Sequence, residues 1–181
     1  MSEPPHLAPL PEQLRRLGAP DDVLALVTAE HDTWRELHDR LIGLIAALLD
    51  LACRDRPVAE VIDDLIGSAA VPLDRLVGSG VDAGEVAALL RAHGSVGTAT
   101  TDPTTGDVEF RHACGTGQRY WRDVPDAATV ADGEVPGVPG GRPRYCARCV
   151  RAITAHGGGA WTVSPPPDTV EPCVWRVQGP R

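Results

Sequence analysis

The chain of 181 residues carries a formal net charge of −8 and is long enough to bury a hydrophobic core of its own. Its longest apolar run, residues 41–52, is interrupted by Gly43 and Asp50 and is shorter than the roughly 20 residues that cross a bilayer. We therefore expect no membrane span. The first residues show no basic segment followed by an apolar one, so no signal peptide is visible and a reducing, cytoplasmic location is expected.

Charge and residue usage narrow the classes of function. Residues 1–107 contain 18 acidic residues and 8 arginines, whereas residues 108–181 contain 7 and 9. An acidic protein repels phosphate backbones, so nucleic acid is not the expected partner, and a small-molecule ligand fits better. The chain has no lysine, which excludes lysine Schiff bases and the phosphate-loop lysine. The common nucleophile, dinucleotide-binding and paired-histidine zinc motifs are also absent.

Helical patterns fill the first half of the chain. After a flexible N-terminus of residues 1–10, a helical region is expected over residues 11–94. Proline and acidic residues mark helix starts there, and Gly18 and Gly94 mark stops. The patterns predict helices over residues 11–17, 21–53, 57–66, 71–77 and 82–93, the last with Asp82 and Glu85 in a capping arrangement.

The long predicted helix carries an apolar stripe of the kind by which helices pack. The stripe follows alternating steps of four and three and contains two histidines, His31 and His38. In one interpretation these histidines are hydrogen-bonded at the edge of the core. In the other they line a cavity with Trp34 and act as a general base or orient a substrate, because imidazole titrates near neutral pH. The stripe comprises Val27, His31, Trp34, Leu37, His38, Leu41, Leu44, Ile45, Leu48 and Leu51.

The second half, residues 95–181, is predicted to be β-rich and to form one compact unit with the helices. Residues 96–101 and 108–114 predict a hairpin, 118–122 a further strand, 125–143 a loop, and 146–153 a short helix. Residues 160–164 and 173–177 predict the last two strands. The period of two in the second hairpin strand places Val108, Phe110, His112 and Cys114 on one inward face.

Four cysteines in this half form the strongest chemical pattern. Cys146 and Cys149 have the two-residue spacing that lets both thiolates reach one tetrahedral ion, and they stand at a predicted helix start, where backbone amides stabilise thiolates. Cys114 precedes a Gly-Thr-Gly turn that resembles half of a zinc knuckle, and Cys173 begins the last strand. We predict that these four bind zinc.

Several alternatives stay open at this stage. His112 is a substitute for the fourth ligand or a donor behind it, and Cys53 on the long helix reads as a core residue. Ordinary buried cysteines would explain the pattern without metal. An iron-sulfur cluster also takes four thiolates, although the closely spaced cysteines of ferredoxins are missing.

Residues 108–181 resemble an uncharacterised bacterial family. The resemblance rests on the Cys114-Gly-Thr-Gly turn, the segment Tyr145-Cys-Ala-Arg-Cys149, the segment Ala160-Trp-Thr-Val-Ser-Pro-Pro and the ending Pro172-Cys-Val-Trp-Arg. That family has a similar Cys-Gly-Ser-Gly turn, a Tyr-Cys-x-x-Cys pair and a Pro-Cys-x-Trp terminus in the same order. The resemblance implies that the four cysteines act as one unit and implies no substrate.

Together these patterns predict an α+β protein, a helical N-terminal half packed on a small antiparallel sheet with a zinc-ribbon or treble-clef-like metal site. Two functions compete. One is a small enzyme or accessory factor acting on an organic metabolite; the other is a non-catalytic binding or regulatory module with structural zinc, whose helix 82–93 and hairpin are used as in a winged helix.

Overall fold

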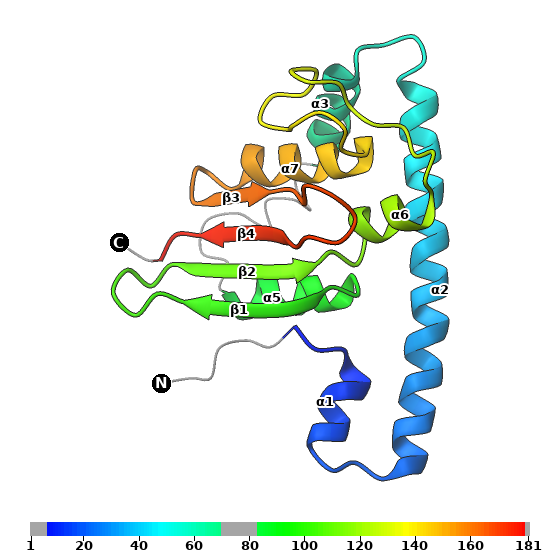
Figure 1. Cartoon of the computed structure of the whole chain (residues 1–181), viewed down its shortest axis with the longest axis vertical. Coiled ribbons are helices and arrows are strands. Elements are labelled where there is room, and N and C mark those ends of the chain that lie inside the picture. The colour runs from blue at the N-terminus through cyan, green and yellow to red at the C-terminus, as the bar shows by residue number, and fades with distance from the viewer. Residues whose placement is uncertain (1–6, 70–82, 180–181) are drawn as a thin grey trace.

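The computed structural model describes residues 7–69 and 83–179, which form a helical part and one four-stranded sheet (Figure 1). The first helices are α1 (Leu10–Arg16), α2 (Asp21–Ala52), α3 (Val58–Ser68) and α5 (Ala83–Ala92). A hairpin of β1 (Val96–Thr101) and β2 (Val108–Ala113) follows. Then come α6 (Gly117–Asp123), α7 (Arg144–His156), β3 (Trp161–Ser164) and β4 (Cys173–Val177). The predicted α+β class is therefore confirmed at this level.

The sheet has the strand order β1-β2-β4-β3, and every neighbouring pair is antiparallel. Its register places Phe110 between Ala99 and Trp175, and His112 between Gly97 and Cys173. Val108, Phe110 and His112 are all buried, which confirms the inward face that the period of two predicted for this strand. One face of the sheet is thus apolar, and His112 and Cys173 are neighbours at one end of it.

Helices α5 and α7 supply the apolar residues that cover this face. Their buried side chains and those of the strands form one hydrophobic cluster, which also includes Leu7 from the segment before α1. Leu7 forms an isolated bridge with Gly97 at the edge strand. A second cluster lies between α3, α7 and the loop before α7, and contains Leu49, Cys53, Val58, Val61, Ile62, Ile66, Val130, Val135, Val138, Ala147, Val150 and Ala152.

The long helix α2 runs unbroken through Gly43 and stands beside the ends of the strands (Figure 1). It contacts the rest of the protein through His38, Ile42, Ala46 and Leu49. Apart from His31 and His38, the stripe that the sequence singled out lies on another side of the helix, and most of its large side chains are exposed. Both faces satisfy helical periodicity, so periodicity alone could not choose between them.

One predicted element is wrong, and two lie outside the described residues. Residues 118–122 were expected to form a strand but belong to helix α6. A strand would point Gln118 and Arg119 to opposite faces, whereas both side chains are buried and hydrogen-bonded here, so tertiary contacts override strand propensity. The helix expected over 71–77 and the cap at Asp82 fall in the segment that is not described. In the described ranges, no helix has the length and apolar character needed to cross a membrane.

Candidate metal centre and adjoining pocket

Helix α7 presents two of the four cysteines. It begins directly after Pro143, a residue that suits the start of a helix because it has no amide hydrogen to leave unpaired. Cys146 and Cys149 are three residues apart and therefore lie on the same side of the first two turns. Cys146 is buried and Cys149 is half-buried. The predicted helix start at the Cys-x-x-Cys pair is confirmed.

The turn after β2 brings Cys114 against this helix. The backbone N–H of Cys114 donates to the side-chain oxygen of Gln118 over 3.0 Å, and the Cys114 sulfur lies 3.1 Å from the Thr116 hydroxyl. A Cβ atom added to Gly117 would stand 2.7 Å from the sulfur of Cys146. Only glycine therefore allows the turn to approach α7 this closely.

Gln118 also fixes the segment that leads to Cys173. Its amide nitrogen donates to the carbonyl oxygens of Glu171 over 2.5 Å and of Asp168 over 3.2 Å. Because the same side chain accepts from Cys114, one buried glutamine ties the first and last cysteines of the set to each other.

All four predicted ligands line one small cavity of about 20 Å³. That volume holds about one atom-sized guest. Cys53 lies in the separate cluster around α3, as expected for a core residue. The cavity wall comprises Cys114, Thr116, Gly117, Cys146, Cys149, Val150, Val163, Pro165, Pro166, Cys173 and Trp175.

The ionisation of the thiols reflects this shared, buried environment. Burial is the main cause that raises the pKa of Cys146 and Cys173, and it raises the pKa of Cys149 to about 12. The second cause in each case is the charge of Cys114, which shows that the four groups interact. Arg142 and Arg148 oppose the shift at Cys146 and Cys149. A cation among these thiols would be needed to hold them as thiolates near neutral pH.

The cysteines are neighbours without forming a complete coordination shell. Across residues 7–69 and 83–179, no three or more His, Cys, Asp or Glu side chains are placed as a formed metal-binding group. The donor set and the cavity nevertheless fit one soft, tetrahedral ion, because thiolates are preferred zinc ligands and the space suits a single atom.

His112 lies on the other side of this cluster. It is 1% exposed, and among the residues that the structure describes neither of its ring nitrogens meets a hydrogen-bond partner. Burial lowers its pKa to about 4, against a smaller opposing effect of the Ala113 backbone. An unpaired buried imidazole costs about 1–3 kcal/mol, so this side chain is a strong candidate for contact with a ligand.

A second cavity, of about 90 Å³, adjoins the first and contains His112. It is lined by Leu89, Leu90, His93, Ser95, His112, Cys114, Thr116, Tyr145, Arg148, Cys149, Ala152, Ile153 and Trp175. No acidic residue is among these, and most of the wall is apolar. Cys114, Thr116, Cys149 and Trp175 are shared with the smaller cavity, so the two sites are separated by a single layer of side chains.

His93 in this wall is supported by a polar network that reaches α2. The Nδ1 atom of His93 is 3.0 Å from Nε2 of His38, and Nη2 of Arg119 is 3.4 Å from Nδ1 of His38. Arg119 also donates twice to the Asp39 carboxylate, over 2.9 and 2.5 Å. Because arginine only donates, Nδ1 of His38 accepts and its Nε2 proton points to His93.

Burial is the main cause that lowers the pKa of both His38 and His93. At His38, Asp39 raises the pKa and Arg119 lowers it. At His93, the charges of His38 and Arg148 lower it further. Both rings are therefore neutral near pH 7, and because Nδ1 of His93 accepts from His38, the proton of the His93 ring lies on Nε2.

No family profile, no curated protein and no solved structure matches this chain. The function must therefore be argued from the geometry of the site itself.

The two histidines of α2 that the sequence paired lie in different places. His38 belongs to the network behind the 90 Å³ cavity, whereas His31 lines an open hollow with Trp34 against α1 and α5. The Trp34 ring stands between them, with its centroid 6.1 Å from that of His31 and 5.0 Å from that of His38. They do not form one site.

Sequence reasoning missed His93 and Arg119. In the sequence His93 appears only as the last residue of a predicted helix, and Arg119 lies in the segment that was expected to form a strand. The available signal was Gly94, which has φ +71° and lies against the Arg119 guanidinium, but its meaning depends on a contact between segments far apart in the chain.

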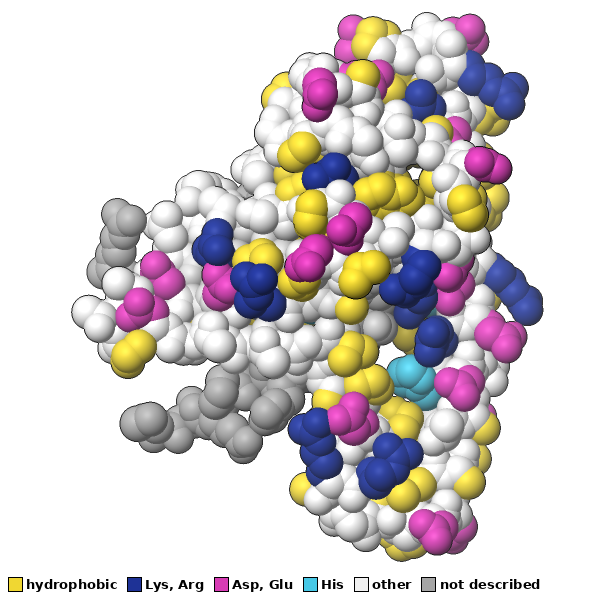
Figure 2. Space-filling view, viewed as in Figure 1, with side chains coloured by type: hydrophobic (Ala, Val, Ile, Leu, Met, Phe, Trp, Pro, Cys, Tyr) yellow, Lys and Arg dark blue, Asp and Glu magenta, His cyan; other side chains and the backbone are white. Residues whose placement is uncertain are grey.

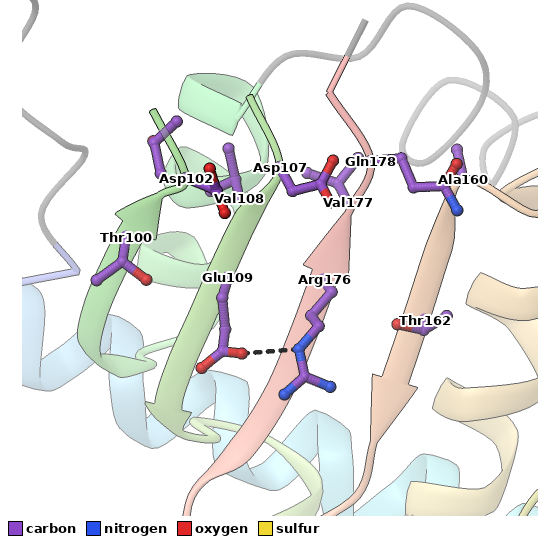
Figure 3. A pocket seen from close by; sticks show the side chains of 11 residues that line it. Thr100, Asp102, Asp107, Val108, Glu109, Ala160, Thr162, Arg176, Val177 and Gln178 are labelled. Atoms are coloured by element: carbon purple, nitrogen blue, oxygen red, sulfur yellow. Dashed lines mark hydrogen bonds and ion pairs between the residues drawn. The ribbon is translucent and has the colours of Figure 1, made fainter. Parts of the chain in front are cut away.

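A hollow of about 520 Å³ lies on the outer face of the sheet, away from the cysteines. Figure 3 shows Thr100, Glu109, Arg176 and Thr162 side by side across the four strands. Its charged groups already have partners, since Glu109 binds Arg176 over 2.7 Å and Asp107 accepts from the Gly179 amide. These charged groups of the trough are thus engaged with other groups of the protein.

Proposed function

We propose that this protein binds one zinc ion through Cys114, Cys146, Cys149 and Cys173. The observation that carries the proposal is that four cysteines from three separate segments line one cavity the size of a single ion. Four thiolates make a closed site, which suits a structural role. An iron-sulfur cluster, with its several iron and sulfide atoms, needs far more room than about 20 Å³. A zinc-ribbon or treble-clef-like site remains the description we favour.

The choice between Cys173 and His112 as fourth ligand also follows from position. The two face each other across β4 and β2, but Cys173 lines the smaller cavity with the other cysteines, whereas His112 lines the larger one. We assign Cys173 to zinc and His112 to the adjoining pocket.

In this proposal the pocket next to the zinc is the functional one and takes a small, uncharged organic molecule. Its wall is mostly apolar and its volume admits only a few non-hydrogen atoms. Two polar handles face such a guest, namely the unpaired ring of His112 and the neutral ring of His93. Arg148 supplies a positive charge that offsets the nearby thiolates.

His93 can orient the guest in this pocket. Its Nε2–H can donate a hydrogen bond to a bound molecule, because His38 donates to Nδ1 of His93 and is itself held by Arg119. The zinc ion, when bound, holds the turn after β2, the first turns of α7 and the start of β4 in register.

The ligand set is tested by replacing each cysteine with serine and measuring zinc in the purified proteins. We expect one zinc per wild-type chain and a loss of most zinc in Cys114→Ser, Cys146→Ser, Cys149→Ser and Cys173→Ser, because serine is a poor zinc ligand. Cys53→Ser is the matched control, since it is a buried cysteine outside the cavity, and it should retain zinc. Loss of zinc from Cys53→Ser but not from Cys173→Ser would refute the assignment.

The variant His112→Phe tests the role of the pocket independently of metal binding. This variant should keep its zinc. Its free energy of unfolding should equal that of the wild type or exceed it by up to about 1 kcal/mol, because phenylalanine replaces an unpaired polar ring by an apolar ring of similar shape. Acetamide and 2-butanone serve as probes of the pocket. In the wild type, both probes should shift the NMR signals of the histidine side-chain nitrogens. In His112→Phe, they should leave the signals of His93 unshifted. Zinc loss in this variant would instead make His112 a ligand.

A further inference from the structure

The longest helix of the molecule leaves an apolar face without cover. On α2 the side chains of Trp34, Leu37, Leu41, Leu44, Ile45, Leu48 and Leu51 are between 37% and 56% exposed. We call these seven residues the α2 stripe. Contiguous apolar patches of this length are uncommon on the surfaces of monomers and mark interaction sites.

The stripe is not a displaced part of the core. The same helix packs on the body through His38, Ile42, Ala46 and Leu49, which are buried. At 100° per residue, the centre of the stripe lies about 115° around the helix axis from the centre of the body-facing residues, with Trp34 and Ile45 at its nearer edge. In Figures 1 and 2, α2 forms one edge of the molecule, where a partner has access.

The spacing of the stripe identifies the kind of partner. From Trp34 to Leu51 the main members follow one another at intervals of three, four, three, four and three residues. This is a period of 3.5 residues, the repeat by which one helix packs its side chains between those of another helix. No charged residue interrupts these positions, so the surface fits a helix rather than a strand or a loop.

The stripe is also complementary to itself. If a second α2 runs antiparallel about a two-fold axis between residues 42 and 43, Trp34 meets Leu51, Leu37 meets Leu48, and Leu41 meets Leu44 of the other copy. Each of these contacts joins the two alternating seam positions, which is the pairing that antiparallel helices make. A two-fold interface requires this property, since the same patch must serve on both sides.

The size of the stripe is sufficient for a modest dimer. Eighteen residues span about 27 Å of helix, and a helix is about 10 Å wide. Two such faces with interdigitating side chains bury about 1,000 Å² in total, near the lower limit for specific interfaces. The expected dimer is therefore in exchange with monomer at micromolar concentrations.

From these observations we infer that the α2 stripe is the interface of a homodimer, in which the α2 helices of two copies pair antiparallel around Leu41 and Leu44. The body of each copy packs on a different side of α2, so both copies keep their cysteine cavity and adjoining pocket outside the interface.

Sedimentation of the full-length chain over a range of concentrations tests the inference. The wild type should form a dimer. Leu41→Gln/Leu44→Gln should raise the dissociation constant of this dimer at least about 100-fold, because it replaces all four leucines at the centre of the interface, two from each copy. Leu17→Gln/Leu65→Gln is the matched control: these leucines are 81% and 43% exposed and lie outside the stripe, so the dimer should persist.

A wild type that stays monomeric up to several hundred micromolar would overturn the inference and would assign the stripe to another partner or to another segment of this chain. An unchanged dimer in Leu41→Gln/Leu44→Gln would overturn it equally. Orientation is tested by oxidation of zinc-loaded Leu37→Cys/Leu48→Cys, which should cross-link, whereas Leu37→Cys alone should not. Cross-linking of the single variant would show parallel helices.

Discussion

At the scale of single residues, the region around the cysteines depends on a few residues whose type is fixed by their contacts. Gln118 holds the backbone of Cys114 and the carbonyls before Cys173 at once. Gly117 leaves the space that the sulfur of Cys146 occupies. Neither role is visible in the sequence, because each depends on a contact between segments that are distant in the chain.

Gly117→Ala should weaken zinc binding at least about tenfold. The added methyl group would stand 2.7 Å from the Cys146 sulfur, and relieving such overpacking costs about 1–3 kcal/mol. Competition with a chromophoric zinc chelator measures the change. Gly67→Ala is the control, because nothing lies within 4 Å of its added Cβ in α3, and it should bind zinc normally. Equal affinities in the two variants would argue against the close approach of turn and helix.

At the scale of elements, α2 shows which properties of a helix can be predicted from its sequence. Its bounds and its apolar stripe followed from the pattern, and the β1–β2 hairpin and β4 were also predicted with their observed bounds or within one residue. The direction in which the stripe faces did not follow, because a core and a partner helix both select the same periodicity. The buried face of α2 includes a histidine and an alanine, which dilute its apolar signal.

The junction between α2 and α5 should make stability depend on pH. His38 and His93 have folded-state pKa values below the ordinary value of 6.5, chiefly through burial, with Asp39, Arg119 and Arg148 as the charged groups around them. The unfolded chain therefore takes up protons first as the pH falls. Stability should be constant above about pH 6.5 and should decrease below it.

His38→Gln/His93→Gln should reduce that decrease, and urea unfolding at pH 7.5 and 5.0 measures it. His112 titrates in the same direction, so some slope will remain. His31→Gln, which changes a histidine outside the network, is the control and should keep the full slope. An undiminished slope in the double variant would show that the pair is not the acid-sensitive element.

At the scale of the whole molecule, the cysteine cavity joins parts of the chain that are some sixty residues apart. The sequence singled out the four cysteines that line this cavity because two of them have ligand spacing, one follows an alternating strand and one begins another strand. It could not place the 90 Å³ pocket, whose polar members come from the end of α5, from β2 and from α7. Pockets between elements depend on packing angles that local patterns do not encode.

The most direct measurement is X-ray absorption at the zinc edge on the purified full-length protein. The proposal expects one zinc per chain with four sulfur neighbours at about 2.3 Å and no nitrogen neighbour. A first shell that includes a nitrogen at about 2.0–2.1 Å would replace Cys173 by His112, and a sample with iron and no zinc, or with no metal at all, would contradict the central claim.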